Sequence, residues 1–598
     1  MTSRRIEDYA FLSDTESCAL VGRDGSIDWL TFPRFDSPAC FAALLGTDDN
    51  GHWTLCPAGP VRNVERRYRP GTLVLETTFR TDEGEVVVVD AMPIRADSRL
   101  DVVRRVEGRS GRVPMRMVLS ARFDYGSIVP RVLATDRGAT VVAGPDALNL
   151  STPVPITIDE GEVSASFVVA EGDAVAFDLA WNRSHDEPPA STDVARAIED
   201  TTRWWRDWSS RCHRFGKYDE CIATSLTVLK GLTYAPTGGI VAAATTSLPE
   251  VIGGQRNWDY RYCWLRDATF TLLSLIEAGF TDEAVAWRDW LLRAVAGQPE
   301  DVQIMYGPAG ERRLTELTLD WLEGFAGSTP VRIGNDAHGQ FQLDVIGEVL
   351  DVLFEGERAE LFHGPDTVEL AGSLVEVAMD RWREPDDGLW EMRSGRDHFT
   401  HSKVMAWVAL DRAVRLAERT GCSYETRDLN ELRASREEIR TQVLAHGVDD
   451  RGVFVQTFGG SALDASLLMV PLVGFLPGDD PRVVATVEAI QRELTHDGFV
   501  HRYDTDAVDD GVGGPEGTFV MCTLWLVDAL VLMDRRTEAE ALFERVLALR
   551  NDVGLLAEMW DPAAGRQLGN LPQAFSHTAL ATSAMALSPR GPREARHR

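Results

Sequence analysis

Short apolar runs rich in β-forming residues, separated by turn residues, give the chain a β pattern from about residue 50 to residue 182. Two strand-like runs, 72–79 and 85–90, are joined by the acidic-glycine sequence Asp82-Glu83-Gly84, a pattern that predicts a β-hairpin. The same arrangement returns at 159–161, between the runs 156–158 and 163–169. Short strands at this spacing, without helical segments between them, favour an antiparallel β-sandwich.

Near Thr192 the β pattern ends and helical periodicity begins. Residues 194–212 place Trp204, Trp205 and Trp208 on adjacent faces of one helix, which we expect to link two domains and to bury these rings against a partner. After Tyr218 the pattern predicts twelve further helices, near 218–233, 266–279, 282–297, 341–355, 366–381, 401–419, 425–445, 463–475, 481–494, 517–533, 536–549 and 573–586.

These helices are of two kinds. Segments 467–475 and 524–533 are apolar on nearly every side, whereas 425–445 and 536–551 carry a polar face, as inner and outer layers require. Six helical hairpins closed into an (α/α)6 barrel account for this alternation; a solenoid would also, but the chain has no fixed-period repeat. We therefore expect a β-sandwich at 1–192, a linker helix at 193–215, the barrel at 216–590 and a tail at 591–598.

Composition and charge narrow the function. The 598 residues contain 61 Lys and Arg against 93 Asp and Glu, a net charge of −32, which disfavours binding to nucleic acid or to an anionic membrane. The longest apolar stretch, Phe519 to Met533, includes Thr523 and Asp528 and is shorter than the ~18 apolar residues of a membrane span. No apolar segment follows the N-terminal arginines, so we expect a cytoplasmic protein. The sequence leaves homo-oligomerisation open.

Loops between the predicted helices are rich in aromatic, glycine and charged residues. In 253–268 the aromatic residues Trp258, Tyr260 and Trp264 alternate with arginine and aspartate, including Arg266 and Asp267. Aromatic rings stack on the apolar faces of sugars, and arginine and aspartate can hold neighbouring hydroxyl groups. The segment therefore predicts a sugar site, although an ion-paired helix start with core aromatics would have the same composition.

Two glutamates stand in unusual surroundings. Glu391 lies in Gly-Leu-Trp-Glu-Met and Glu558 in Leu-Leu-Ala-Glu-Met-Trp, each between bulky apolar residues. A desolvated carboxyl has a raised pKa and can act as a general acid, although capping or hydrogen bonding of a structural glutamate is the commoner role. His398 and His401 form an HxxH without the glutamate of a zinc protease and close to Lys403, so we expect neither a metal nor a cofactor.

Ordered motifs then indicate a family. They are RNWDYRYCWLRDA at 256–268, GLWEM at 388–392 followed by HFTHSKVMAWVALDRA, HRYDTD at 501–506 with GPEGTF at 514–519, and LLAEMWDPAAGRQLGNLPQAFSH at 555–577. Together they resemble family 15 glycoside hydrolases, the glucoamylases and bacterial trehalase-like enzymes. Segments 6–10 and 25–38 look like the start of a trehalase-like β domain. The resemblance covers nearly the whole chain and implies a β-sandwich followed by an (α/α)6 barrel.

The resemblance also implies roles for single residues. Glu391 matches the general acid of an inverting glycosidase, Glu558 matches the general base, and Tyr260 matches the tyrosine beside the attacking water. The residues that we expect to bind substrate are Trp258, Trp264, Arg266, Asp267, Trp390, Arg502 and Glu516. The chain departs from many relatives in having Met392 and Met559, not a second acid, after each catalytic glutamate.

The function expected from these residues is an inverting, exo-acting α-glucoside hydrolase that releases β-glucose. Trehalose is the leading substrate because the β domain looks trehalase-like. A glucoamylase or α-glucosidase acting on maltose, isomaltose or short α-glucans is the alternative, since only the second sugar subsite differs. A disaccharide phosphorylase on the same barrel and a non-catalytic sugar-binding protein are the further alternatives; a phosphorylase needs no base carboxylate, so Glu558 argues against it.

Overall fold

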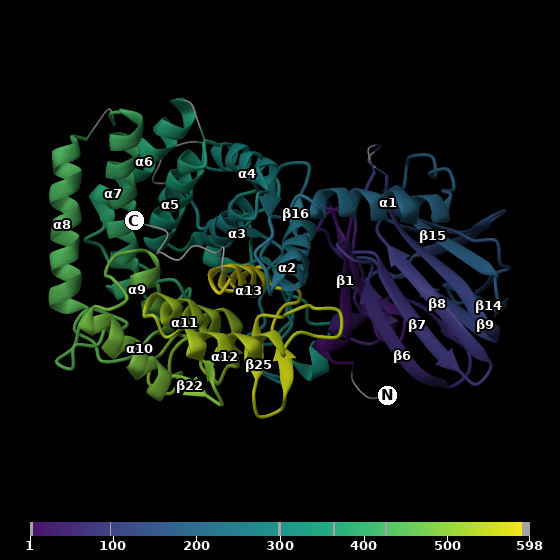
Figure 1. Cartoon of the computed structure of the whole chain (residues 1–598). Coiled ribbons are helices and arrows are strands. Elements are labelled where there is room, and N and C mark those ends of the chain that lie inside the picture. Colours follow the sequence, from purple (N-terminus) through teal and green to yellow (C-terminus); the bar gives the residue numbers. More distant parts are fainter. Residues whose placement is uncertain are drawn as a thin grey trace.

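The structure is a computed structural model that describes residues 4–95, 97, 99–296, 301–362, 365–424 and 427–588. The predicted tail 591–598, and the ends of two predicted helices at 297 and 425–426, lie outside these ranges. The strands β1 to β15 form one half of the molecule and the helices α2 to α13 the other (Figure 1). Helix α1 (Val194–Ser209) runs from the β half to the helical half.

The β half contains two antiparallel sheets that share the strand β9 (Leu100–Ser120). The first part of β9 pairs with β8 and β15, and its second part pairs with β5 and β14. One sheet consists, in order, of β6 (Val61–Tyr68), β7 (Leu75–Thr81), β8 (Gly84–Ala91), β9, β15 (Ala174–Arg183), β12 (Asp146–Ser151), β11 (Gly138–Ala143) and β10 (Arg131–Thr135). The other consists of β1 (Tyr9–Ser13), β2 (Cys18–Gly22), β3 (Ser26–Thr31), β4 (Ala39–Phe41), β5 (His52–Pro57), β9, β14 (Glu162–Ala170) and β13 (Thr157–Asp159).

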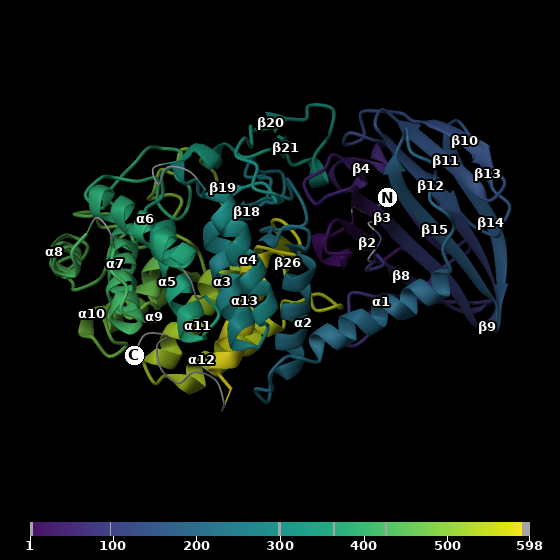
Figure 2. The same cartoon turned by 90° about the horizontal axis from the view of Figure 1, so that it is seen from above.

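Side chains from both sheets form a common core, in which Trp53, Met117 and Phe177 are fully or almost fully buried. The two predicted hairpins are confirmed, because β7 pairs with β8 and β13 pairs with β14 in antiparallel register. Helix α1 lies against β9 and β15, as Figure 2 shows from above. Its Trp208 stacks on Phe280 of the helical half at a centroid distance of 4.1 Å. The expected packing role of the α1 tryptophans is confirmed.

In the described part of the helical half, twelve α-helices follow α1, as the periodicity predicts. They are α2 (Asp219–Gly231), α3 (Leu265–Glu277), α4 (Thr281–Ala294), α5 (Asp344–Arg358), α6 (Pro365–Arg381), α7 (Thr400–Thr420), α8 (Leu429–His446), α9 (Met469–Leu472), α10 (Pro481–Glu493), α11 (Val520–Leu532), α12 (Arg536–Leu547) and α13 (Ala574–Ala586). The predicted helix 463–475 is shorter than expected: a 3-10 turn at Ala465–Leu468 leads into the single turn α9.

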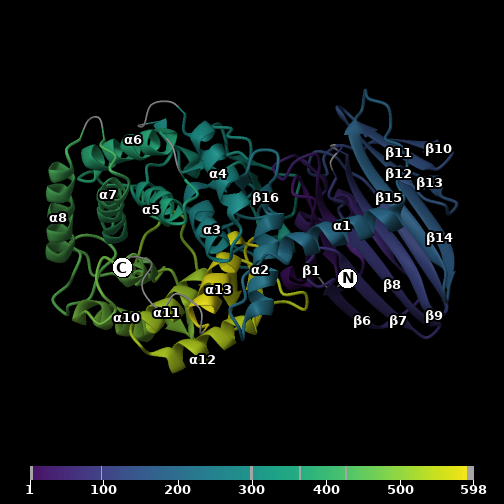
Figure 3. The same ribbon diagram turned by 45° about the horizontal axis from the view of Figure 1, so that its top comes forward.

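The helices form two concentric layers (Figure 3). Contacts run from α3 to α5, α7, α9, α11 and α13 and back to α3, so these six helices close an inner ring. Burial follows the sequence pattern, since α11 is buried along Val520–Leu530, whereas α8 buries only Leu432, Ile439 and Val443. The ring of six helical hairpins is therefore confirmed. None of the described helices is long and apolar enough to cross a membrane.

Short strands join the loops of the helical half. These are β16 (Thr233–Tyr234), β17 (Gly239–Ile240), β18 (Cys263–Trp264), β19 (Met305–Tyr306), β20 (Leu317–Thr318), β21 (Arg332–Ile333), β22 (Thr495–His496), β23 (Phe499–Val500), β24 (Thr518–Phe519), β25 (Met559–Asp561) and β26 (Arg566–Leu568). The strands β24, β25 and β26 form one sheet, which connects the loop before α11 to the loop before α13.

The β half fixes one of the loops that precede the inner helices. Arg261 is fully buried, pairs with Asp259 at 2.6 Å and donates to the Tyr125 hydroxyl at 2.9 Å and to the Ser37 carbonyl at 3.0 Å. Its guanidinium lies 5.7 Å from the Trp29 ring centroid. Successive residues of an extended segment point to opposite sides. Arg261 points to the β half, so the preceding residue Tyr260 points to the centre of the ring.

Candidate active site

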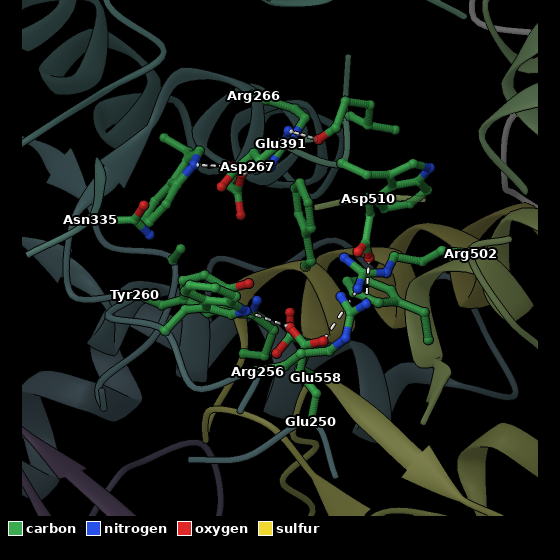
Figure 4. A pocket seen from close by; sticks show the side chains of 18 of the residues that line it. Glu250, Arg256, Tyr260, Arg266, Asp267, Asn335, Glu391, Arg502, Asp510 and Glu558 are labelled. Atoms are coloured by element: carbon green, nitrogen blue, oxygen red, sulfur yellow. Dashed lines mark hydrogen bonds and ion pairs between the residues drawn. The ribbon is translucent and has the colours of Figure 1, made fainter. Parts of the chain in front are cut away.

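A pocket lies where the loops preceding α3, α7, α11 and α13 meet (Figure 4). Its empty space, including the solvent at its open mouth, is about 710 Å³. The lining residues are Ala242, Glu250, Arg256, Trp258, Tyr260, Trp264, Arg266, Asp267, Asn335, Leu389, Trp390, Glu391, Arg393, Arg502, Tyr503, Asp510, Val512, Phe519, Glu558, Gln573 and Phe575.

The structure brings most of the sequence-predicted site residues together here. Those that line the pocket are Trp258, Tyr260, Trp264, Arg266, Asp267, Trp390, Glu391, Arg502 and Glu558. Glu516 is not among the lining residues: its side chain is fully buried and both of its oxygens accept hydrogen bonds from Arg502 at 3.1 Å. Arg502 thus lies between the Glu516 carboxylate and the pocket.

Glu391 lies in a tight turn. It has a left-handed backbone with φ of 60°, and its N–H donates to the Gly388 carbonyl at 3.1 Å. Such a conformation is costly for a residue with a side chain and occurs preferentially at functional sites. Trp264 Nε1–H donates to Glu391 Oε1 at 2.7 Å, and Arg266 Nη2 lies 3.6 Å from the same oxygen. The carboxyl is 21% exposed and opens into the pocket.

Glu558 occupies the opposite side of the pocket from Glu391 (Figure 4). It precedes β25, is 2% exposed and accepts a hydrogen bond from Tyr260. Gly569 leaves room for the carboxyl, since a Cβ atom there would lie 2.6 Å from Glu558 Oε2. Burial, with the nearby Glu250 carboxylate, raises the pKa of Glu558 well above its usual range. Glu558 Oε2 has no hydrogen-bond partner among the described residues.

Asp267 provides a second unsatisfied acceptor. It lies in the first turn of α3 beside Arg266, whose Nη2 is 3.4 Å from Asp267 Oδ2, yet this oxygen has no hydrogen-bond partner among the described residues. Burial raises the pKa of Asp267 to about 7, against the opposing effect of Arg266. An unpaired buried acceptor is costly, and the hydroxyl groups of a sugar are suitable donors. Arg266 is held in place by donating to the Leu389 carbonyl at 2.7 Å.

An ion pair and a further hydrogen bond lie on the side of the pocket that holds Glu558. Arg256 pairs with Asp510, which also accepts from the Tyr503 hydroxyl at 2.8 Å. Hydrogen bonds from Val512 N–H, Arg256 and Tyr503 outweigh burial and hold the pKa of Asp510 well below its usual range. Glu250 accepts from Trp258 Nε1–H at 3.0 Å.

Family models match both halves of the chain. The model described as glycosyl hydrolases family 15 matches residues 216–585, and the model described as trehalase-like, N-terminal matches residues 1–204. The chain belongs to family 15 of the glycosyl hydrolases. It is thus a glycoside hydrolase, and inversion of configuration is characteristic of this family. The likeness inferred from the ordered motifs is confirmed.

Relatives of this family 15 enzyme cover nearly its whole length. A protein of Mycobacterium tuberculosis named trehalase is 42% identical over 96% of this chain and 88% of its own length. A protein of Thermoplasma volcanium, also named trehalase, is 31% identical over 96% of this chain and 92% of its own. A bacterial glucoamylase crystallised with acarbose shares the fold, with a TM-score of 0.74 and 12% identity over 99% of this chain and 95% of its own.

Some pocket residues of the family 15 enzyme were missed from sequence. Glu250 lies in Ser-Leu-Pro-Glu-Val, a segment without aromatic or glycine enrichment, and only its position shortly before the 253–268 loop could have drawn attention to it. Asp510 stands in an acidic loop in which neighbouring aspartates look equivalent. Both are recognisable only through the arginines that they contact.

Proposed function

We propose that this family 15 enzyme hydrolyses trehalose with inversion of configuration at the attacked carbon. The observation that carries the proposal is the placement of Glu391 and Glu558 on opposite sides of a single pocket. An inverting glycosidase needs one carboxyl to protonate the glycosidic oxygen and another to activate water on the opposite face of the sugar. The choice of trehalose is supported by relatives of that name that match 96% of the chain.

In this mechanism Glu391 is the general acid. Its oxygen, hydrogen-bonded to Trp264, is held at the open side of the pocket, where a bound disaccharide would place its glycosidic oxygen. The bound sugar displaces water from this carboxyl. Glu391 gives its proton to the departing glucose, which leaves as the α-anomer because its own anomeric bond is not broken.

Glu558 is the general base. Its free Oε2 accepts a proton from the attacking water, and the Tyr260 hydroxyl, whose pKa burial and the Glu558 charge raise well above its usual range, remains a donor that fixes the carboxylate. Attack from this side releases the first glucose as the β-anomer. Proton transfer by a positioned carboxylate contributes typically 10²- to 10⁴-fold to the rate.

The nonreducing glucose is bound deep in the pocket. Asp267 Oδ2 accepts from its hydroxyl groups, and Arg266 donates to their oxygens. Trp258, Trp264 and Trp390 supply aromatic surface around the ring, as sugar recognition requires. We propose that Arg502 also contacts the sugar, while Glu516 acts by orienting Arg502.

We propose the same domain limits as from sequence: a β-sandwich at 1–192, a linker at 193–215 and a catalytic barrel from 216 to 590. The break in structure between β15, which ends at Arg183, and α2, which begins at Asp219, supports this division. The buried Arg261 contacts explain why the two domains would act together.

The test is a panel of trehalose, maltose, isomaltose and kojibiose, followed by anomer-resolved NMR. We expect turnover of trehalose to exceed that of the other disaccharides, and Glu391→Gln and Glu558→Gln each to lose at least ~10²-fold in kcat. Faster turnover of maltose or isomaltose would change the assigned substrate from trehalose to an α-glucan. Unchanged turnover in either variant would overturn the catalytic assignment.

A further inference from the structure

The pocket side that holds Glu558 contains more negative than positive charge. The group of side chains concerned, called the acidic cluster below, comprises Glu250, Arg256, Arg502, Asp510, Glu516 and Glu558. Four carboxyls thus face two guanidiniums. Two of the carboxyls have their own cation: Asp510 pairs with Arg256, and Glu516 receives hydrogen bonds from Arg502 on both oxygens.

Glu250 and Glu558 are the two carboxyls that remain. Glu250 is 1% exposed and receives only a shared contact from Arg502 Nη2, at 3.2 Å, in addition to the neutral Trp258 N–H. Glu558 has the neutral Tyr260 hydroxyl as its donor. Glu250 therefore shares its cation, Arg502, with Glu516. Among the described residues, no cation forms an ion pair with Glu558.

Glu250 and Glu558 both line the pocket and lie on the same side of it (Figure 4). Two buried carboxyls in this position cannot both ionise without cost. Burial is the largest effect on each, and it raises the pKa of Glu250 to about 7 and that of Glu558 well above its usual range. The negative charge of Glu250 is the next largest cause of the shift at Glu558. Interacting carboxyls titrate as a pair and hold one proton between them over the range in which each alone would be ionised.

We propose that Glu250 shares one proton with Glu558 and thereby sets the lowest pH at which Glu558 can accept a proton from water. Glu250 is a positioning residue, because it acts through Glu558 and through Trp258. The inference rests on the role proposed for Glu558. The charged and titratable groups that face the pair are Arg256 and Tyr260 from the loop before α3, Glu391 across the pocket, Arg502 from the loop after β23, and Glu516 from the segment before β24.

The pH dependence of kcat/KM for trehalose tests the proposal. Glu250→Gln removes the charge and keeps the shape, so the proton is held less tightly by Glu558. We expect the acidic limb of the profile to move by about one pH unit or more toward lower pH, as is typical of carboxyls that share a buried site. An acidic limb that stays in place in an active Glu250→Gln enzyme would overturn the proposal.

Two controls separate charge from structure. Glu250→Asp keeps the carboxylate, and we expect its acidic limb to remain near that of the wild type even if kcat falls. Asp510→Asn removes one carboxylate from the same pocket, but its charge is balanced by Arg256 and is not among the main influences on Glu558. We expect a smaller shift than in Glu250→Gln; equal shifts in the two variants would contradict a specific role for Glu250.

Infrared spectroscopy detects the shared proton without any reaction, and so distinguishes this inference from the proposed function. We expect wild-type protein at pH 7 to show a protonated-carboxyl component that is lost in both Glu250→Gln and Glu558→Gln, measured as the difference between the wild-type and variant spectra. Other buried carboxyls, such as Asp267, absorb in all three proteins and cancel in these differences. If either variant retains the full band, no proton is shared. If Glu250→Gln does not fold, Glu250→Ala takes its place, because it removes the same carboxyl; loss of the band in Glu558→Gln alone would also occur if Glu558 held the proton by itself. Failure to hydrolyse trehalose, with the band behaving as expected, would overturn only the proposed function.

Discussion

Replacing Gly569 with alanine tests how tightly the fold fixes Glu558. Gly569 follows β26 in a left-handed conformation with φ of 76°, and its N–H donates to the Pro249 carbonyl at 2.8 Å. A Cβ atom at this position would lie 2.6 Å from Glu558 Oε2 and 2.7 Å from Glu558 Cβ. Both distances are far below the ~3.5–4.0 Å at which carbon atoms pack without repulsion.

The expected effect has two parts. Alanine in the left-handed region costs about 1–2 kcal/mol of stability. Relief of the contact requires the Glu558 carboxyl to move by about 1 Å, and a misplacement of this size at a reacting group costs roughly 10²-fold in rate. We therefore expect Gly569→Ala to fold with a slightly lower melting temperature and to lose about 10²-fold in kcat, with a smaller change in KM.

Gly565→Ala is the matched control. Gly565 lies in the same β25–β26 hairpin and also has a left-handed backbone, with φ of 62°, but nothing lies within 4 Å of its would-be Cβ. It carries the backbone cost without the contact. Steady-state kinetics on trehalose and thermal melting of both variants are the measurements. If the two variants lose the same activity, or if Gly569→Ala retains activity within twofold of the wild type, the reasoning about Glu558 is refuted.

Three further predictions follow from single contacts. Trp264→Phe removes the N–H that bonds Glu391 at 2.7 Å, so we expect kcat/KM to fall by about 10- to 100-fold, the equivalent of one hydrogen bond to a charged group; an unchanged value would mean that the bond does not orient Glu391. Burial lowers the pKa of His577 to about 3, so the stability that its neutral form contributes is complete above pH ~6.5 and falls by ~1.4 kcal/mol for each pH unit below this. We expect the melting temperature to fall less steeply with acid in His577→Gln than in the wild type. Parallel curves of melting temperature against pH would contradict this. Asp552→Asn leaves the fully buried Arg66 guanidinium without its anion, so we expect the free energy of unfolding measured by denaturant titration to fall by about 3 kcal/mol. An unchanged unfolding midpoint would show that this contact between the two halves is dispensable.

The fold was predictable because each half has a consistent hydrophobic pattern. The apolar runs on both sides of Asp82-Glu83-Gly84 form the paired strands β7 and β8, of which β7 buries alternate residues and β8 buries every residue from Val86 onward. The apolar circumference of 524–533 requires the inner position that α11 occupies. The helix predicted at 463–475 was too long because it gave more weight to the apolar run than to Pro471, which lies within α9, and Gly474, which follows it, although both residues interrupt helices. The sharing of β9 between two sheets was not predictable, since pairing partners depend on contacts distant in sequence.

The site was predictable where residue type and family resemblance agree. Glu391 and Glu558 have similar apolar neighbours in the sequence. In the structure, however, Glu391 lies at the open side of the pocket, whereas Glu558 is buried. This difference arises from Trp264 and Gly569, which are distant from the respective glutamates in sequence. The sequence does not show whether Glu516 contacts a substrate or supports a residue that does; only the position of Arg502 in the structure reveals the contact between these two side chains.

The anomeric form of the first products tests the central claim most directly. Trehalose should be followed in ¹⁸O-labelled water at times shorter than mutarotation, with ¹H NMR to resolve the anomers and ¹³C NMR to detect ¹⁸O at each anomeric carbon. The account predicts equal initial amounts of α- and β-glucose, with the ¹⁸O label confined to the β-anomer, because water attacks one glucose from the Glu558 side and the other departs with its bond intact. Release of α-glucose alone, or label in the α-anomer, would contradict inversion by Glu391 and Glu558.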